Sequence, residues 1–141
     1  MGANTQFSIA VHVLTALGFH AQAGGTCAPS GELAKSVNTT PSFVRRVMAK
    51  LSKAGIVRTT TGKSGSCALA RSPREITLLE VYRAVEAPKA FAIHHYPPQR
   101  SCPVSCGIKP ALQNILDKAQ GSMERGLAGI TLADVIKDAQ G

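Results

Sequence analysis

Residues 40–55, TPSFVRRVMAKLSKAG, decide the fold of this chain. Thr40 suits a helix N-cap, Pro41 fits the first helical position because its missing N–H costs nothing there, and Gly55 ends the segment. Four apolar residues recur at helical spacing and predict a face that packs on a core: Val44, Val47, Met48 and Leu51. We therefore expect a helix over 41–54 with one buried face and one free, basic face.

The segments around this helix complete the pattern of a winged helix-turn-helix. A short helix is expected over 30–38, preceded by an amphipathic helix over 5–17 that Gly18 ends. After the helix come two short runs, 56–60 and 67–70, on either side of a glycine-containing tip, which indicates a β-hairpin. Two helices joined by a tight turn and followed by a hairpin are typical of this motif, whose second helix enters the DNA major groove.

The second half of the chain predicts a loop between helices. A capping box at Thr77 and Glu80 begins a helix that ends near residue 86, and a proline-rich loop follows over 87–107. Apolar residues then recur at helical spacing over 108–127, and a short capped helix starts at Thr131. A lone helix as long as the one over 108–127 needs a partner, so we expect this helix to mediate dimerisation.

The predicted fold class is mainly α with a small β-hairpin wing (α+β): a winged helix-turn-helix with a long C-terminal dimerisation helix. We divide the chain into three parts. Residues 1–87 form the winged helix-turn-helix DNA-binding domain, 88–107 a cysteine-containing effector loop, and 108–141 the dimerisation helix and C-terminal helix.

The charge of the chain is uneven and favours a polyanionic partner. The 141 residues carry 16 Lys and Arg against 8 Asp and Glu, a net charge of +8. Residues 1–64 hold seven basic residues against one acidic residue, or +6, so most of the excess lies in the predicted DNA-binding half. Because neutralised phosphates release condensed counterions, this distribution favours nucleic acid as the partner.

Composition also limits the class of protein. With 44% hydrophobic and 17% charged residues the chain is globular and not disordered, and its length suits one domain with an appended element. The apolar run over 7–19 lacks a preceding basic region and is too short to span a bilayer, so we expect no signal peptide and no membrane partner. Four cysteines without an export signal predict a cytoplasmic protein.

Four segments carry a resemblance to a known family. They are GELA at 31–34, VRRVMAKLSKAGIV at 44–57, ITLLEVYRAVE at 76–86 and ITLADV at 130–135. The chain resembles the bacterial winged-helix regulators of the Rrf2 or BadM type, which include IscR, NsrR and CymR, and looks most like their YwnA-type branch. Two features depart from that pattern. Gly65-Ser66-Cys67 replaces the family's consecutive glycines and aromatic residue, and two cysteines precede the long helix where cluster-binding members have three.

The resemblance implies a homodimer whose two recognition helices and two wings contact a palindromic operator in double-stranded DNA. The predicted DNA-binding residues lie at the start and on the exposed face of the recognition helix and at the wing tip. They are Thr40, Ser42, Phe43, Arg45, Arg46, Lys50, Lys63, Ser64, Gly65 and Ser66. The basic residues of the helix suit phosphates, and a bidentate Arg to guanine is the commonest specific contact.

The four cysteines fall into two groups. Cys27, in a glycine-flanked loop, and Cys67, in the predicted wing, are expected to be small apolar fillers. Cys102 and Cys106 lie in the proline-rich loop near two histidines and two basic residues, and we predict that they form a redox-sensing pair. The alternatives are a thiol pair without chemistry, which ranks second, and zinc or an iron–sulfur cluster, which ranks third. No resident cofactor is therefore expected.

Three classes of function follow from this pattern. The first is a homodimeric, sequence-specific transcriptional regulator, a repressor that responds to thiol oxidation; a metal- or iron–sulfur-responsive regulator of the same fold is the nearest alternative. The second is a non-sensing winged-helix protein that binds nucleic acid or is purely structural. The third, a thiol enzyme, is not expected, because no general base and orienting group accompany any cysteine, and Cys-x-x-Cys is absent.

Overall fold

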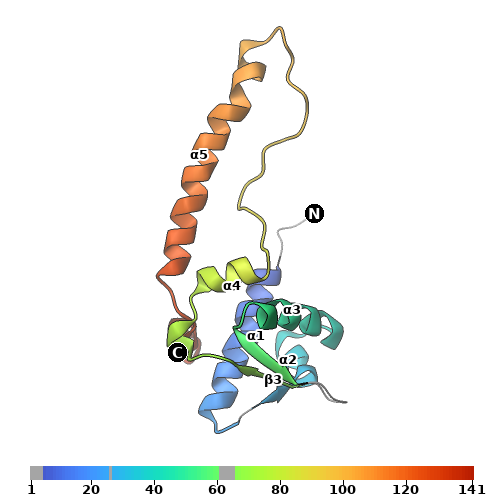
Figure 1. Ribbon diagram of the computed structural model, residues 1–141, viewed down its shortest axis with the longest axis vertical. Coiled ribbons are helices and arrows are strands. Elements are labelled where there is room, and N and C mark those ends of the chain that lie inside the picture. Colours follow the sequence, from blue (N-terminus) through green and yellow to red (C-terminus); the bar gives the residue numbers. More distant parts are fainter. Residues whose placement is uncertain (1–4, 26, 61–65) are drawn as a thin grey trace.

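The computed structural model shows a body of packed helices with a small sheet, from which one long helix projects (Figure 1). It describes residues 5–25, 27–60 and 66–141. The helices are α1 (Gln6–Gln22), α2 (Ser30–Val37), α3 (Pro41–Lys53), α4 (Leu78–Ala84), α5 (Pro103–Ala128) and α6 (Leu132–Ala139), and the strands are β1 (Ala28–Pro29), β2 (Val57–Thr60) and β3 (Ser66–Leu69). This architecture confirms the predicted mainly α fold with a small β-hairpin and a long C-terminal helix.

The apolar face predicted for α3 is buried in the core of the body. Its residues Val44, Val47, Met48 and Leu51 are at most 2% exposed, and the core around them includes buried side chains of α1, α4 and α6. Thr40 is the N-cap of α3, because its hydroxyl oxygen accepts a hydrogen bond from the Phe43 N–H at 3.3 Å. Within the described residues, no helix has both the length and the apolarity needed to cross a membrane.

The turn before α3 and the sheet after it complete the winged helix-turn-helix. Asn38, directly after α2, has a left-handed φ of 68°, a conformation that asparagine tolerates better than most residues. The sheet is antiparallel in the order β1-β3-β2, and β2 and β3 form the predicted hairpin. The sequence did not predict β1, because a strand of two residues is too short to show an alternating pattern.

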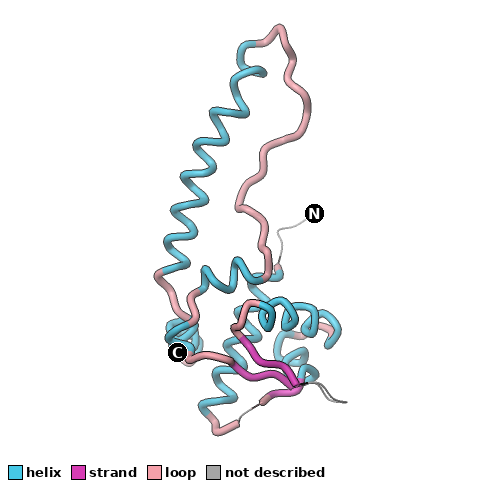
Figure 2. Tube along the Cα trace, viewed as in Figure 1, coloured by secondary structure: helices cyan, strands magenta, loops and turns pink. Residues whose placement is uncertain are grey.

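α5 and the segment before it form an arm outside the body. After α4 the chain runs outward as a loop and returns along α5 (Figure 2). The structure describes all 26 residues of α5, and Gln120 is the only one that is buried. The helix therefore has almost no core of its own within one chain.

Gln120 is the centre of a hydrogen-bond network at the base of this arm. Its side-chain oxygen accepts from the Ala90 N–H at 3.0 Å, and its nitrogen donates to the Tyr82 hydroxyl oxygen at 2.9 Å and to Glu124 at 3.0 Å. The Tyr82 hydroxyl donates to the Pro88 carbonyl at 2.6 Å. One buried amide thus joins α4, the outgoing loop and α5.

The long helix begins earlier than the sequence predicted. The expected start was Ile108, with 87–107 as a loop, but α5 begins at Pro103, so the loop ends at Cys102. Proline is tolerated at the first helical position, and Cys102 has extended backbone angles and acts as the N-cap. Pro103 was counted among the prolines of the predicted loop, although a proline at the first helical position is compatible with a helix.

Two capping boxes fix the starts of α4 and α6, as their sequences predicted. Thr77 and Glu80 cap α4, and Thr131 and Asp134 cap α6, each through reciprocal side-chain and backbone hydrogen bonds. Thr77 and Thr131 also form an isolated antiparallel bridge. The two ends of the segment that contains the arm are thereby held together.

Glu80 links this capping box to the end of the wing. Arg71 donates to both Glu80 carboxylate oxygens at 3.3 Å. Burial raises the pKa of Glu80, but the hydrogen bonds from Thr77 and Arg71 and the charge of Arg71 outweigh it and lower the pKa below the ordinary 4.5. Because the pKa of Glu80 is lower in the folded than in the unfolded state, the ionised carboxylate stabilises the fold. This stabilisation is fully present above the unfolded-state pKa and is lost as the pH falls through the folded-state pKa.

We predict that Glu80→Gln lowers stability near neutral pH and flattens its decline in acid. The glutamine keeps the shape of the side chain but removes the charge, so the variant loses the part of the pH dependence due to Glu80. Urea denaturation at a series of pH values measures the effect. Glu75→Gln, at an exposed position nearby, is the matched control and should follow wild type. An equal loss of stability at all pH values would contradict the assignment.

α1 continues past the glycine that was expected to end it. The predicted helix stopped at Leu17, but α1 runs to Gln22 and Gly18 lies inside it, buried. A Cβ atom at Gly18 would lie 2.2 Å from Cδ1 of Ile136, which is itself 3% exposed. Gly18 therefore permits close packing of α6 on α1, a requirement that a single sequence does not reveal.

We predict that Gly18→Ala destabilises the fold by about 1 kcal/mol, because the strain of overpacking exceeds the gain in helix propensity. Combining it with Ile136→Val, which removes the clashing methyl group, should recover most of the loss. Gly31→Ala is the control, since a Cβ there meets no described atom within 4 Å. Equilibrium unfolding in urea tests all three variants, and a Gly18→Ala protein more stable than wild type would contradict this account.

Candidate nucleic-acid interface

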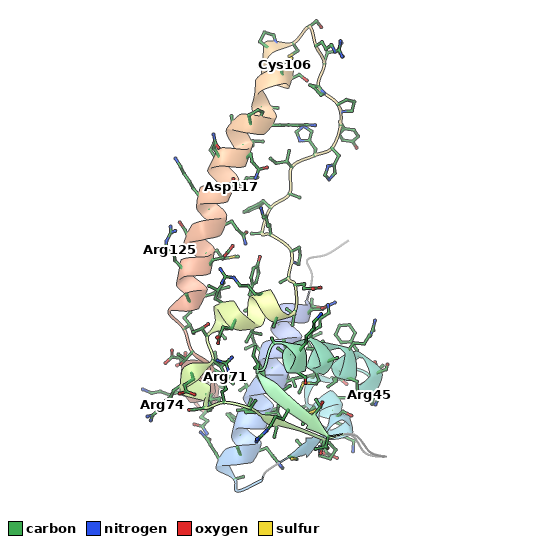
Figure 3. The ribbon with its side chains drawn as sticks, viewed as in Figure 1. Arg45, Arg71, Arg74, Cys106, Asp117 and Arg125 are labelled. Atoms are coloured by element: carbon green, nitrogen blue, oxygen red, sulfur yellow. The ribbon has the colours of Figure 1, made fainter. Side chains whose placement is uncertain are left out.

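The exposed face of α3 carries two of the predicted DNA-binding arginines. Arg45 and Arg46 are both exposed, as is Ser42 at the start of the helix. Figure 3 shows Arg45 at the edge of the body, on the opposite side from Arg74. Among the described residues, neither Arg45 nor Arg46 forms an ion pair, so both charges are available to phosphates.

Phe43 supports one of these arginines. Its ring is half-buried against the core, and the Arg46 guanidinium carbon lies 5.1 Å from the ring centroid in a cation–π contact. A guanidinium held over an aromatic face loses less side-chain entropy on binding than one that is free in solvent. We therefore interpret Phe43 as a residue that positions Arg46.

Lys50 is oriented differently from the arginines. Its ammonium group donates to the Gln6 side-chain oxygen at 2.9 Å and to the Val85 carbonyl at 3.5 Å, and the residue is only partly exposed. Lys50 thus joins α3 to the start of α1 and to the end of α4. Lys50 therefore differs from Arg45 and Arg46, which are exposed. Helical periodicity alone could not distinguish an exposed position from one at the edge of the core.

The predicted wing tip lies mostly outside the described residues. Lys63, Ser64 and Gly65 fall there, whereas Ser66 begins β3 and its hydroxyl lies 2.6 Å from that of Thr60 at the end of β2. In the view of Figure 1 these strand ends and the N-terminal end of α3 lie toward the same side of the body. The strand ends at Thr60 and Ser66 are the described parts of the hairpin that adjoin the predicted tip in the sequence.

Arg58 was not among the predicted site residues. It is an exposed residue of β2, paired with Ala68 of β3. The sequence contained a signal for it, since Arg58 is a basic residue between the recognition helix and the wing tip. The alternation of side chains along a strand would have placed it on the exposed face. It adds a further exposed arginine, on the strand that follows α3.

Cys102 and Cys106 lie at the tip of the arm, where Figure 3 labels Cys106. The Cys102 sulfur, at the N-cap of α5, accepts a hydrogen bond from the Ser105 N–H at 3.4 Å. The Cys106 thiol, in the first turns of the helix, is exposed and donates to the carbonyls of Gln99 and Arg100, each at 3.7 Å. Both thiols are free, and they lie at opposite ends of the first helical turn.

The other two cysteines lie beside the sheet. Cys67 is buried in β3, opposite Ala28 of β1, and Cys27 is the exposed residue directly before β1. Burial raises the pKa of the Cys67 thiol, and the neighbouring Cys27 raises it further. A thiol with a raised pKa is protonated at neutral pH and weakly nucleophilic, which is consistent with Cys67 as a packing residue.

A metal site does not fit the described residues. No group of three or more His, Cys, Asp or Glu side chains in the described part of the chain lies close enough together to hold a metal ion. His94 and His95 line a pocket beside Lys109 that contains neither Cys102 nor Cys106. Because these thiols and imidazoles do not converge, we derive no role for zinc or for an iron–sulfur cluster.

Comparison with known proteins identifies the family. The family model described as "Rrf2: Iron-dependent Transcriptional regulator" matches residues 3–138. Over 133 residues, which cover 94% of this chain and 96% of the relative, the chain is 35% identical to a Bacillus subtilis protein named as an HTH-type transcriptional regulator, YwnA.

Solved structures share this fold over almost the whole chain. IscR of T. potens matches with a TM-score of 0.72 at 24% identity, covering 99% of this chain and 88% of its own. CymR (YrzC) of B. subtilis, named the global cysteine regulator, matches with a TM-score of 0.69 at 17% identity, covering 97% of both chains. Because the family model matches residues 3–138 and the YwnA relative is 35% identical, this chain belongs to the Rrf2 family of DNA-binding transcriptional regulators.

Proposed function

We propose that this protein is a homodimeric transcriptional repressor that binds a palindromic operator and senses thiol oxidation at the tip of its arm. The observation that carries the DNA-binding part is the pair of exposed arginines on the face of α3 opposite its buried face, neither of which has an ion-pair partner among the described residues. In a winged helix-turn-helix that face enters the major groove, where arginine contacts phosphates and guanine edges.

The exposed surface of α5 supports a homodimer. Ile115 is 60% exposed and Val104 is 70% exposed, although both are large apolar residues on a helix that buries only Gln120. Helices in proteins gain most of their stability from tertiary packing, which α5 largely lacks within one chain, and a second copy of the same helix can cover its apolar side. Two-fold symmetry then presents two α3 helices to two half-sites about one turn of DNA apart.

Repression is the simplest effect of such a dimer, because a protein that covers an operator excludes polymerase without any further contact. The test is a footprint on DNA fragments selected for binding by the purified protein, followed by a promoter–reporter assay. We expect protection of an inverted repeat and reporter activity that rises when the gene for the protein is deleted. A monomeric footprint or a reporter that falls would contradict the proposal.

The redox part of the proposal rests on the first turn of α5. Hydrogen peroxide oxidises Cys102 and Cys106 to a disulfide: the two thiols give up two electrons and two protons, and the O–O bond of the peroxide breaks to give two waters. The new S–S bond competes with the N-cap hydrogen bond from Ser105 to the Cys102 sulfur. Pro110, inside the helix, has no N–H for the carbonyl of Cys106, so this turn is weakly held and can rearrange.

We predict that peroxide lowers the operator affinity of the wild-type protein about tenfold, within the usual range of coupling between distant sites, and that dithiothreitol restores it. Cys102→Ser and Cys106→Ser should bind like the reduced wild type before and after treatment. Cys27→Ser, which removes an exposed thiol elsewhere, is the matched control and should respond like wild type. Titration by fluorescence anisotropy, with mass mapping of the linked thiols, measures the effect. If peroxide lowers the operator affinity of both Cys102→Ser and Cys106→Ser as much as that of wild type, this pair is excluded.

A further inference from the structure

A groove lies between α1, α2 and α6, and its lining contains none of the cysteines and none of the arginines of α3. α1 supplies most of its lining, α2 supplies Ser36, and α6 supplies Val135 and Ala139. Its volume is about 530 Å³. Small-molecule sites typically have volumes of about 300–1,000 Å³ and bring together several secondary-structure elements, as this groove does.

The lining of the groove is mostly apolar. Val11, Ala16 and Val135 are half-buried, and Phe19 presents a ring that is 39% exposed. None of the described lining residues is Asp, Glu, Lys or Arg. Because an unpaired charge is costly to bring into apolar surroundings, this lining favours an uncharged ligand, and the Phe19 ring favours an aromatic one.

The groove also has polar lining residues, two of which are hydrogen-bonded to each other. The His12 Nε2 atom lies 3.0 Å from the Ser36 hydroxyl oxygen, in a hydrogen bond that joins α1 to α2. A serine hydroxyl both donates and accepts, and an imidazole has two ring nitrogens, so this pair can also bond a ligand group that donates or accepts. An apolar cleft with a few convergent polar groups is the usual form of a small-molecule site.

We propose that this groove is a binding site for a small, uncharged aromatic molecule that carries one hydroxyl or carbonyl group. The ring of the ligand packs on Phe19 and Val135, and its polar group hydrogen-bonds to His12 and Ser36. Ser36 lies in the last turn of α2, so the bound molecule contacts the first helix of the helix-turn-helix. The site is separate from the DNA-binding face, and its occupancy can be measured without DNA.

The experiment uses 2-naphthol as the probe and ligand-detected NMR titration of the full-length protein. Saturable binding of 2-naphthol to wild type is expected, with weaker binding of naphthalene, which lacks the hydroxyl, and of 2-naphthalenesulfonate, which is charged. His12→Phe keeps a ring but removes the hydrogen-bonding nitrogens. This variant should bind 2-naphthol about two- to tenfold more weakly, the range expected for one neutral hydrogen bond, and should bind naphthalene with unchanged affinity.

Ala16→Trp, which fills the groove, should weaken 2-naphthol at least about tenfold, because the ring of the ligand has no remaining space. Ala21→Trp is the matched control: it places the same side chain at an exposed position of α1 outside the groove and should bind like wild type. Circular dichroism checks that both variants are folded.

Three results would overturn the proposal. They are no saturable binding to wild type, equal binding to Ala16→Trp and wild type, and a shift of the monomer–dimer equilibrium in Ala16→Trp. The last would mean that a second copy of the chain covers the groove. If the wild-type protein does not bind an operator, the proposed function is contradicted instead. The titration with 2-naphthol does not depend on that result.

Discussion

Replacing Arg46 by alanine is expected to lower operator affinity by about 2–6 kcal/mol per dimer. A good arginine–guanine contact is worth about 1–3 kcal/mol, and a homodimer contains the residue twice. Arg46 is exposed, has no described ion-pair partner, and is held over the Phe43 ring, so its loss removes an oriented charge without disturbing the core. Arg45→Ala should have an effect of the same kind.

The salt dependence of binding distinguishes the two possible contacts of each arginine. If Arg46 binds phosphate, the alanine variant binds all duplexes more weakly, and its salt slope falls by about one for each phosphate that the side chain neutralised. If it binds a base, preference is relaxed at one position of each half-site while the salt slope stays the same. Fluorescence anisotropy with operator and mutated duplexes at several salt concentrations measures both quantities.

Arg74→Ala is the matched control, because it removes the same charge from an exposed position on the opposite side of the body (Figure 3). Its operator affinity should stay close to that of wild type. Lys50→Ala should instead lower folding stability, since it removes the hydrogen bonds to Gln6 and Val85. Equal decreases of affinity in Arg46→Ala and Arg74→Ala would show that α3 is not the recognition helix.

The second large effect is expected for Ile115→Glu, which should convert the dimer to monomers at micromolar concentration. The 60% exposed Ile115 side chain lies on the surface that we assign to the partner, and a glutamate there would be buried without a counter-charge. A monomer contacts only one half-site, so operator affinity should fall by several orders of magnitude. Analytical ultracentrifugation and operator titration measure the two consequences.

Asn114→Glu is the matched control for this variant, since Asn114 is the neighbouring exposed residue and is already polar. It introduces the same charge and should leave the dimer intact. Leu116→Glu is a less specific test, because Leu116 is half-buried beside the outgoing loop of its own chain. An Ile115→Glu protein that keeps the dimer mass would show that another surface of the chain mediates assembly.

Local signals in the sequence predicted much of the fold correctly. The apolar face of α3, its Thr40 cap and the two capping boxes at Thr77 and Thr131 depend on residues close together in the chain, and the structure confirms each of them. The predicted end of α1 was wrong because the deciding contact is distant in sequence. Gly18 stays helical because it packs on Ile136 of α6, more than a hundred residues later.

The candidate site shows the same limit. Spacing placed Arg45, Arg46 and Lys50 on one basic helix, but only the packing of α1 and α4 against α3 shows that Lys50 bonds to the body. The groove beside His12 was not predicted either, since α6, which supplies part of its lining, lies far from α1 and α2 in the sequence. A pattern along one segment does not contain that information.

The network around Gln120 makes the arm a module that can be exchanged as a unit. Tyr82, Glu124 and the backbone of Pro88 and Ala90 fix the base of the arm through one buried amide, and none of these contacts involves the tip. A different sequence between the base of the loop and the first turns of α5 would therefore leave the DNA-binding body unchanged. One scaffold can in this way carry tips of different sequence, and a designed protein can be built by grafting a new tip above Gln120.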